Sequence, residues 1–285
     1  MKKVRDEDFL IFIHIQKCGG MTIQRILRRR YGPSLPSRLW KKILGDDGEK
    51  SLEDYTHADR WMQGHHCFGV HRVLPKPFAY FTMLREPISR LVSLYNFSKR
   101  NPTAYYHGHA SRMTIDEFIA ECELHELNNG QVRFIAGSDD NFFINRTPFG
   151  ECEEELLQRA VQNIENHFFH VGVLDRFDKS ILTIGKKLNW STSLYLRRNV
   201  GKEEKEVPSE KAVDKARSLN QLDMRLYKNQ KERVEKEFSE MFSDEEGTIK
   251  KFRTKNKIYN GVFGPVYDVY ARAKAVVSGN ADQPR

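Results

Sequence analysis

The sequence predicts an α/β fold in which a parallel sheet is flanked by helices on both faces. Three short segments, at 9–13, 78–84 and 168–173, are rich in apolar residues, and the first is apolar without interruption, which is typical of strands buried on both sides. Helical patterns alternate with these segments, and the alternation favours parallel strand pairing. With 285 residues and 39% hydrophobic content, the chain can bury one large core. We predict a single domain over 1–278 and a disordered tail at 279–285.

The helices are predicted from amphipathic periodicity and from their start signals. Pro87 suits the first turn of a helix, and apolar residues recur from Ile88 at helical spacing. Thr114 and Glu117 form a capping box, which opens a helix expected to reach Leu127. The other predicted helices cover 156–164, 178–188 with Asp178 as the cap, and the charged segment 203–230.

The segment after the first strand has the features of a phosphate-binding loop. Gly19 and Gly20 end the strand, and from Thr22 the apolar residues follow the helical period. Backbone N–H groups at such a junction converge near the positive end of the helix dipole. Lys17 adds a mobile positive charge to this P-loop-like arrangement. The order differs from the P-loop pattern G-x-x-x-x-G-K-[ST], because Lys17 precedes the glycines.

A second anion-binding motif follows the strand at 78–84. Arg85 ends this strand, and Ser93 comes eight residues later on the next helix. A guanidinium can bind two phosphate oxygens at once, and a nearby hydroxyl can complete the site. The structural alternative is an arginine at a sheet edge and a serine on an exposed helix face.

With both motifs present in this order, the chain resembles the sulfotransferases that use PAPS (3′-phosphoadenosine 5′-phosphosulfate). The resemblance implies that the loop from Lys17 to Thr22 binds the 5′-phosphate, and that Arg85 and Ser93 bind the 3′-phosphate. The donor-binding residues predicted in this way are Lys17, Cys18, Gly19, Gly20, Met21, Thr22, Arg85, Ser93 and Arg198.

Three further segments resemble the carbohydrate branch of this family, which includes heparan and chondroitin sulfotransferases and bacterial relatives. They are 128–137, 169–180 and 198–200, and the resemblance as a whole covers roughly residues 9–230. It implies a carbohydrate acceptor. The last fifty or so residues carry no resemblance of this kind.

The loop departs from the family pattern at three positions. Gln16 replaces a proline, Cys18 a threonine and Met21 a hydroxyl residue. One side-chain contact to phosphate is therefore in doubt. Cys18 is either a small loop residue or a thiol that makes the site oxidisable.

Sulfuryl transfer to a hydroxyl requires a base that takes the acceptor's proton, and histidine is suited to this role. The pair Gly64–His65 resembles the segment that carries the base in the carbohydrate branch, so His65 is predicted to be catalytic together with Lys17. Strand alternation would turn His66 to the opposite side, and His71 is the reserve candidate. A structural histidine is the alternative. No metal site is predicted, because no set with ligand spacing accompanies these histidines.

Charge and cysteine content limit the possible partners. Residues 1–42 contain eleven Lys and Arg against three acidic residues, which accounts for the whole net charge of +8. This excess favours an anionic cofactor or polymer near the loop, unless residues 28–30 form a solvated helix face. The four cysteines include no C-x-x-C pair, and no apolar stretch is long enough to span a bilayer. If Met1 is the natural start, a cytoplasmic protein without a membrane or nucleic-acid partner is expected.

These observations predict a PAPS-dependent sulfotransferase that modifies a carbohydrate hydroxyl by in-line displacement, with PAP (3′-phosphoadenosine 5′-phosphate) as a product and no metal. One alternative is an ATP-dependent small-molecule kinase with an atypical phosphate loop, which would need an acidic residue at a strand end. The strand ends carry Lys17 and Arg85 instead. The other is a non-enzymatic binder of acidic glycans or nucleic acid through residues 28–30.

Overall fold

A computed structural model describes residues 1–34, 60–73, 77–138, 143–196 and 205–277. Within these residues, four parallel strands form one sheet of order β2-β1-β3-β4. The strands are β1 (Phe9–Ile13), β2 (Trp61–Gly64), β3 (Phe78–Leu84) and β4 (Phe168–Val173). The predicted α/β class is confirmed, and the three strands predicted from their apolar runs have the expected bounds.

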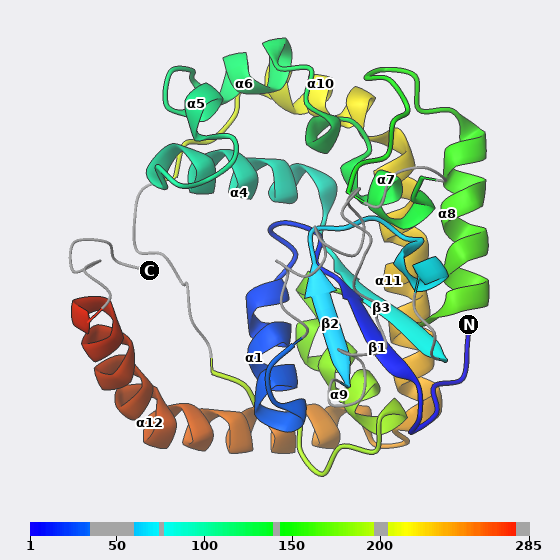
Figure 1. The fold of residues 1–285 in the computed structure, drawn as a ribbon, viewed down its shortest axis with the longest axis vertical. Coiled ribbons are helices and arrows are strands. Elements are labelled where there is room, and N and C mark those ends of the chain that lie inside the picture. Colours follow the sequence, from blue (N-terminus) through cyan, green and yellow to red (C-terminus); the bar gives the residue numbers. More distant parts are fainter. Residues whose placement is uncertain (35–59, 74–76, 139–142, 197–204, 278–285) are drawn as a thin grey trace.

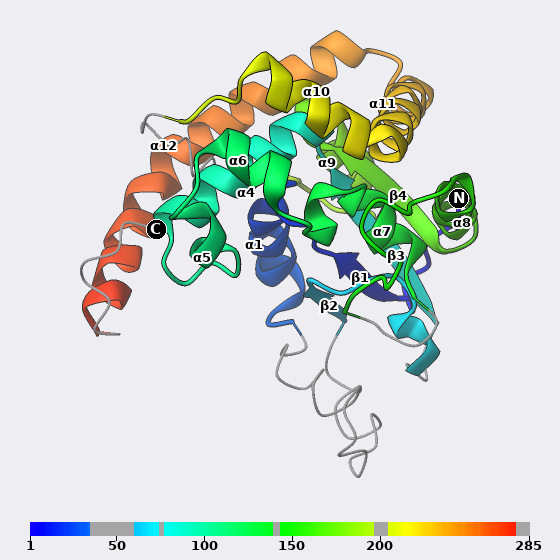
Figure 2. The same ribbon diagram turned by 90° about the horizontal axis from the view of Figure 1, so that it is seen from above.

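Helices cover both faces of the sheet, as predicted. In Figures 1 and 2, α1 (Gly20–Tyr31) and α9 (Phe177–Lys187) lie on one face, and α7 (Gly130–Ala136) and α8 (Glu154–His167) on the other. The long helix α11 (Gln221–Met241) packs against β4. Every residue of β1 is buried as a result, which explains its uninterrupted apolar sequence.

A second group of helices forms its own small core. It consists of α4 (Pro87–Arg100), α5 (His107–Ala110), α6 (Ile115–Glu121) and α10 (Glu210–Leu219). Buried side chains such as Leu91 and Phe118 hold this group together. Because α4 begins directly after β3, the group extends from the carboxyl end of the sheet (Figure 1). The C-terminal helix α12 (Glu245–Val277) packs against α9 and then runs away from the sheet.

The capping box of α6 is present, but the helix is shorter than predicted. Thr114 accepts a hydrogen bond from the Glu117 backbone, and the Glu117 side chain accepts one from the Thr114 backbone. The helix ends at Glu121 rather than Leu127. A 3₁₀ turn, η2 (His125–Leu127), follows and places the Glu126 carboxylate 2.5 Å from the fully buried Arg90 guanidinium. This buried ion pair requires the chain to leave the helical path.

Two other helix predictions are wrong in detail. Asp178 does not cap α9; it lies inside the first turn, where its carboxylate accepts hydrogen bonds from the Tyr195 hydroxyl and from Arg253. The single charged helix expected over 203–230 is two helices, α10 and α11, in the part of it that the structure describes. They separate at Asn220, whose side-chain amide donates to the carbonyl of Leu127.

Within the described ranges, no helix is both long and apolar enough to cross a membrane. The predicted tail at 279–285 and the predicted donor-binding residue Arg198 lie outside the described residues. The single-domain assignment and the cytoplasmic location remain predictions.

Candidate active site

The loop between β1 and α1 has the predicted strand–loop–helix geometry. Lys17 (φ 65°) and Gly19 (φ 83°) adopt left-handed backbone conformations, which turn the chain so that α1 opens at Gly20. A Cβ atom on Gly20 would lie 2.0 Å from the ring of His14, so only glycine fits there without displacing that ring. The backbone N–H groups at the start of α1 therefore border the loop.

The two anion-binding motifs of the sequence come together at the carboxyl edge of the sheet. Because β1 and β3 are neighbouring parallel strands, the loop after β1 and Arg85 after β3 lie side by side. The Arg85 guanidinium donates a hydrogen bond of 3.2 Å from Nη1 to the carbonyl oxygen of Lys17. Burial lowers the pKa of Arg85 from its usual value, but an arginine keeps its charge under such conditions.

Lys17 extends from the loop to α4. Its Nζ atom lies 3.8 Å from the centre of the Phe97 ring, within the range of a cation–π interaction. Burial lowers the pKa of Lys17 to about 8, with smaller contributions from the charges of Arg85 and Arg100. Ser93 precedes Phe97 by four residues on the same helix and so lies on the same face. The geometry thus turns Ser93 toward the side of α4 that Lys17 reaches.

Cys18 and Met21 take different positions in the loop region. The Cys18 thiol is buried, and its Sγ atom lies 3.6 Å from the side-chain oxygen of Gln131. Burial raises the pKa of Cys18 to about 12, which disfavours the reactive thiolate. This favours the interpretation of Cys18 as a structural loop residue over the oxidisable thiol. Met21 is 46% exposed in the first turn of α1, where Thr22 is partly buried.

His65 is exposed and held by one specific hydrogen bond. Its Nδ1 atom lies 2.6 Å from the carbonyl oxygen of His14. A carbonyl oxygen can only accept, so Nδ1 carries a proton, and in the neutral imidazole the lone pair is therefore on Nε2. The two imidazole rings also pack together, with centroids 4.5 Å apart. A general base that acts through Nε2 requires this tautomer, in which the proton is on Nδ1.

His14 connects His65 to the loop and was not predicted as a site residue. It follows β1 directly and is buried under Gly20. Burial, followed by the nearby charges of His65 and Lys17, lowers its pKa to about 3, so His14 is neutral near pH 7. Its position immediately after a buried strand and before the glycines is the only signal in the sequence that could have identified it.

The other two histidines of the segment are placed differently. His66 is buried, with Nδ1 donating to the carbonyl of Cys67, and burial lowers its pKa to about 4. His71 packs against the Phe78 ring at 4.2 Å, and its Nδ1 atom lies 3.1 Å from the Tyr80 hydroxyl. Phe78 begins β3, roughly 20 Å along the strand from its carboxyl end. Of these three histidines, only His65 combines exposure with contact to the loop region.

The basic cluster at 28–30 does not surround the loop. It lies in the last turn of α1, about 15 Å from the start of that helix. Arg29 donates to the Tyr259 hydroxyl on α12, at 2.6 Å, and to the carbonyl of Leu194. Arg30 donates to the carbonyl of Thr192 and packs over the Trp190 ring. The prediction that this charge lies around the anion site is therefore wrong for Arg29 and Arg30. These two arginines attach α1 to neighbouring segments instead.

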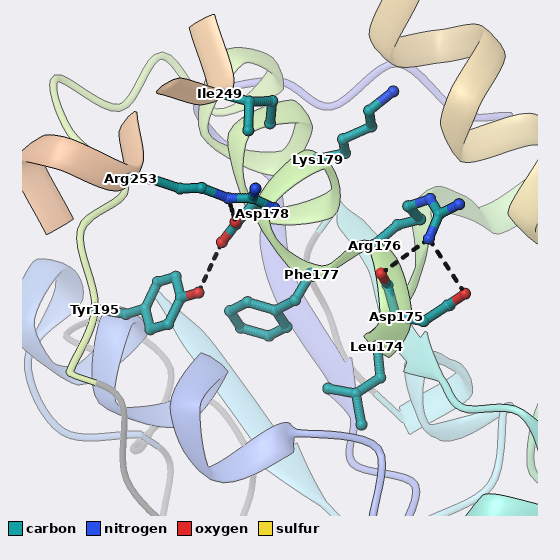
Figure 3. A pocket seen from close by; sticks show the side chains of 9 residues that line it. All are labelled: Leu174, Asp175, Arg176, Phe177, Asp178, Lys179, Tyr195, Ile249 and Arg253. Atoms are coloured by element: carbon teal, nitrogen blue, oxygen red, sulfur yellow. Dashed lines mark hydrogen bonds and ion pairs between the residues drawn. The ribbon is translucent and has the colours of Figure 1, made fainter. Parts of the chain in front are cut away.

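A cavity of about 390 Å³ adjoins the loop on the side of α9 and α12. Leu174 and Phe177 line it, and both also lie against Gly19. Figure 3 shows Asp178 between Tyr195 and Arg253, and the hydrogen bonds to it are 2.7 Å long in each case. The central acidic group of the cavity is therefore already paired within the protein. No cluster of three His, Cys, Asp or Glu side chains suited to a metal was found in the described part of the chain.

A parallel sheet with a strand–loop–helix turn after β1 and an arginine at the end of the adjacent β3 defines a protein of the P-loop-like α/β class. Comparison with known families makes the assignment specific. The sequence model of the galactose-3-O-sulfotransferase family matches residues 61–257, and the chain belongs to this family. The predicted relationship to carbohydrate sulfotransferases is confirmed. The match begins at β2, so the loop at Lys17 precedes it.

The chain is also similar to curated proteins that are named as carbohydrate sulfotransferases. Heparan-sulfate 6-O-sulfotransferase 3 from Homo sapiens is 26% identical over 277 residues, covering 80% of this chain and 58% of the relative. Heparan-sulfate 6-O-sulfotransferase 1 from Homo sapiens is 25% identical over 279 residues, covering 79% and 65%. Galactose-3-O-sulfotransferase 2 from Homo sapiens is 24% identical over 165 residues, covering 56% and 40%. The chain thus spans less than two thirds of the length of each of these relatives.

Proposed function

We propose that this protein transfers a sulfuryl group from PAPS to a hydroxyl of a carbohydrate acceptor. The observation that carries the proposal is the contact between Arg85 and the carbonyl of Lys17, which joins the two anion-binding motifs into one site. A donor with phosphates at both its 5′ and 3′ positions needs two such motifs. The curated relatives, whose names specify sulfotransfer to heparan sulfate or galactose, support both the reaction and the class of acceptor.

The residues present fit a bisphosphorylated donor. The N-terminus of α1 and the left-handed turn at Gly19 direct backbone N–H groups toward a 5′-phosphate, and Thr22 adds a hydroxyl. Arg85 and Ser93 would hold the 3′-phosphate. Arg85 now donates to a carbonyl, and a phosphate would offer it a stronger, charged acceptor. PAPS supplies the sulfuryl group and leaves as PAP.

Two side chains carry the chemistry in this proposal. His65 accepts the acceptor's hydroxyl proton at Nε2, while the hydroxyl oxygen forms the new bond to sulfur and the bond from sulfur to the 5′-phosphate oxygen breaks. Lys17 neutralises the charge that develops on that departing oxygen. Lys17 can leave the Phe97 ring for this role at small cost, because its cation–π contact contributes only about 1–2 kcal/mol.

A transfer assay with two labelled donors tests the proposal against the kinase and the non-enzymatic alternatives. The full chain is incubated with a panel of glycans and either PAPS labelled in its sulfate or ATP labelled in its γ-phosphate. Labelled donors are needed because sulfate and phosphate add nearly the same mass. Transfer from PAPS alone is expected. Transfer from ATP alone would support a kinase, and transfer from neither would support a binding protein.

A further inference from the structure

We propose that Gln131, in the first turn of α7, is a positioning residue that holds the two donor-binding motifs in their relative orientation. The inference rests on the proposed function, since it concerns the same site. Gln131 is completely buried and contacts both motifs. Its Oε1 atom accepts from the backbone N of Arg85 at 2.9 Å and from the Cys18 thiol at 3.6 Å. Its Nε2 atom donates to the Arg85 carbonyl at 2.9 Å.

The amide group of glutamine suits this position because it both donates and accepts. Arg85 is the first residue beyond β3, where its backbone N–H and C=O leave the ladder of the sheet. One side chain satisfies both groups, as a neighbouring strand would. A carboxylate in its place could only accept, and a methionine could do neither. The orientation of the Arg85 backbone, and hence the direction of its guanidinium, depends on this pair of bonds.

The position of Gln131 is fixed by a residue outside the two donor-binding motifs. Its backbone N donates to a carboxylate oxygen of Asp223 at 3.0 Å, and the backbone N of Val132 donates to the other oxygen at 2.7 Å. Asp223 belongs to α11 and is buried. Gln131 therefore links the carboxyl edge of the sheet to a long helix packed on β4. A ligand that contacts the loop and Arg85 together would depend on this link more than a ligand that contacts the loop alone.

The test compares PAP with AMP, which lacks the 3′-phosphate, as ligands of two variants. Gln131→Met keeps the side-chain volume and removes the hydrogen bonds. Gln230→Met is the matched control, because Gln230 is also a buried glutamine, 5% exposed, on α11. Calorimetry should show that Gln131→Met weakens PAP binding by about tenfold or more while AMP binding changes much less. Gln230→Met should leave both affinities close to those of the unmodified protein.

A second readout does not depend on PAP binding. Iodoacetamide labelling of Cys18, followed by mass spectrometry of the peptide, reports whether the loop is still held against Gln131. Faster labelling is expected in Gln131→Met at a temperature where a thermal melt shows the variant folded. If Gln131→Met does not fold, Gln131→Leu, which also removes both kinds of hydrogen bond, undergoes both measurements with the same expectations.

The two readouts separate the failure of this inference from failure of the proposed function. An unchanged PAP-to-AMP affinity ratio together with unchanged Cys18 labelling in the folded variant would overturn the role of Gln131. If the unmodified protein did not bind PAP at all, the proposed function would fail. The labelling rate alone would then decide whether Gln131 holds the loop.

Discussion

Asn129 and Asp223 cap each other's helices. The Asp223 carboxylate accepts from the backbone N atoms of Gln131 and Val132 at the start of α7. In return, the Asn129 side-chain oxygen accepts from the backbone N atoms of Leu222 and Asp223 at the start of α11, at 3.0 and 3.1 Å. Both capping residues are buried. The two helix N-termini, separated by about ninety residues of sequence, thus form one rigid junction beneath the site.

Removing one cap of this junction should lower stability. Asn129 has φ 52°, so Asn129→Gly tolerates the left-handed backbone and removes only the side chain. We expect the free energy of unfolding to fall by about 1–3 kcal/mol, because the buried backbone N–H groups of Leu222 and Asp223 lose their acceptor. Urea denaturation measures this change. Combined with Asp223→Ala, the losses should be non-additive, because each residue caps the helix that carries the other. Simple additivity of the two losses would show that the caps act independently.

The close packing of Gly20 on His14 predicts a second effect. In Gly20→Ala the new methyl group would lie 2.0 Å from the buried His14 ring, which would have to move together with the His65 ring packed on it. We expect a loss of about 1–3 kcal/mol in stability and reduced turnover. Gly108→Ala is the control, since nothing lies within 4 Å of a Cβ atom there. Equal melting temperatures for the two variants would contradict the packing argument.

The lowered pKa of Lys17 predicts an alkaline limit to activity. With a pKa of about 8, Lys17 is protonated at pH 7 and loses its charge as the pH rises through 8. The value of kcat/KM, which reports the free enzyme, should therefore decline above about pH 8, approaching a tenfold loss per pH unit. Lys17→Arg should remove this decline, because arginine stays charged. Lys17→Ala should lower kcat more than the affinity for PAP. If Lys17→Arg and the unmodified protein had the same pH profile, the decline would belong to another group.

The tautomer of His65 supports its assignment as the base. His65→Ala should reduce turnover by about 10² to 10⁴ and leave PAP affinity unchanged. His109→Ala provides the control, because His109 is also exposed but lies on α5. A folded His65→Ala protein with nearly full activity would exclude His65 as the base.

Local patterns predicted much of the fold because local physics determined it. The strands at 9–13, 78–84 and 168–173 are buried almost throughout, so their sequences are mainly apolar, with Thr82 and His170 as exceptions. The capping box at Thr114 is also a local interaction, and it was found. The adjacency of the loop and Arg85 followed from parallel strands, which place their carboxyl ends at one edge.

Other features depend on contacts between distant residues, which a sequence pattern does not reveal. Asn220 separates α10 from α11 because its side chain bonds to Leu127 and to the backbone N of Asn129. The role of Gln131 appears only when α7 meets the end of β3. Arg29 resembles a surface charge in the sequence, yet it attaches α1 to α12. The partner lies 46 residues away for Gln131 and Arg85, and about ninety or more residues away in the other two cases.

The central claim is that the loop at Lys17 and Arg85 form one bisphosphate site. The most direct test is a calorimetric comparison of the affinities for PAP and AMP. Charge-assisted hydrogen bonds contribute about 1.5–3 kcal/mol each, so the loss of two should weaken binding by about 10² to 10⁴. The unmodified protein should therefore prefer PAP by that factor. Arg85→Met should lose most of the preference, and Arg112→Met, at an exposed position, should keep it. Equal affinities of the unmodified protein for PAP and AMP would contradict the account.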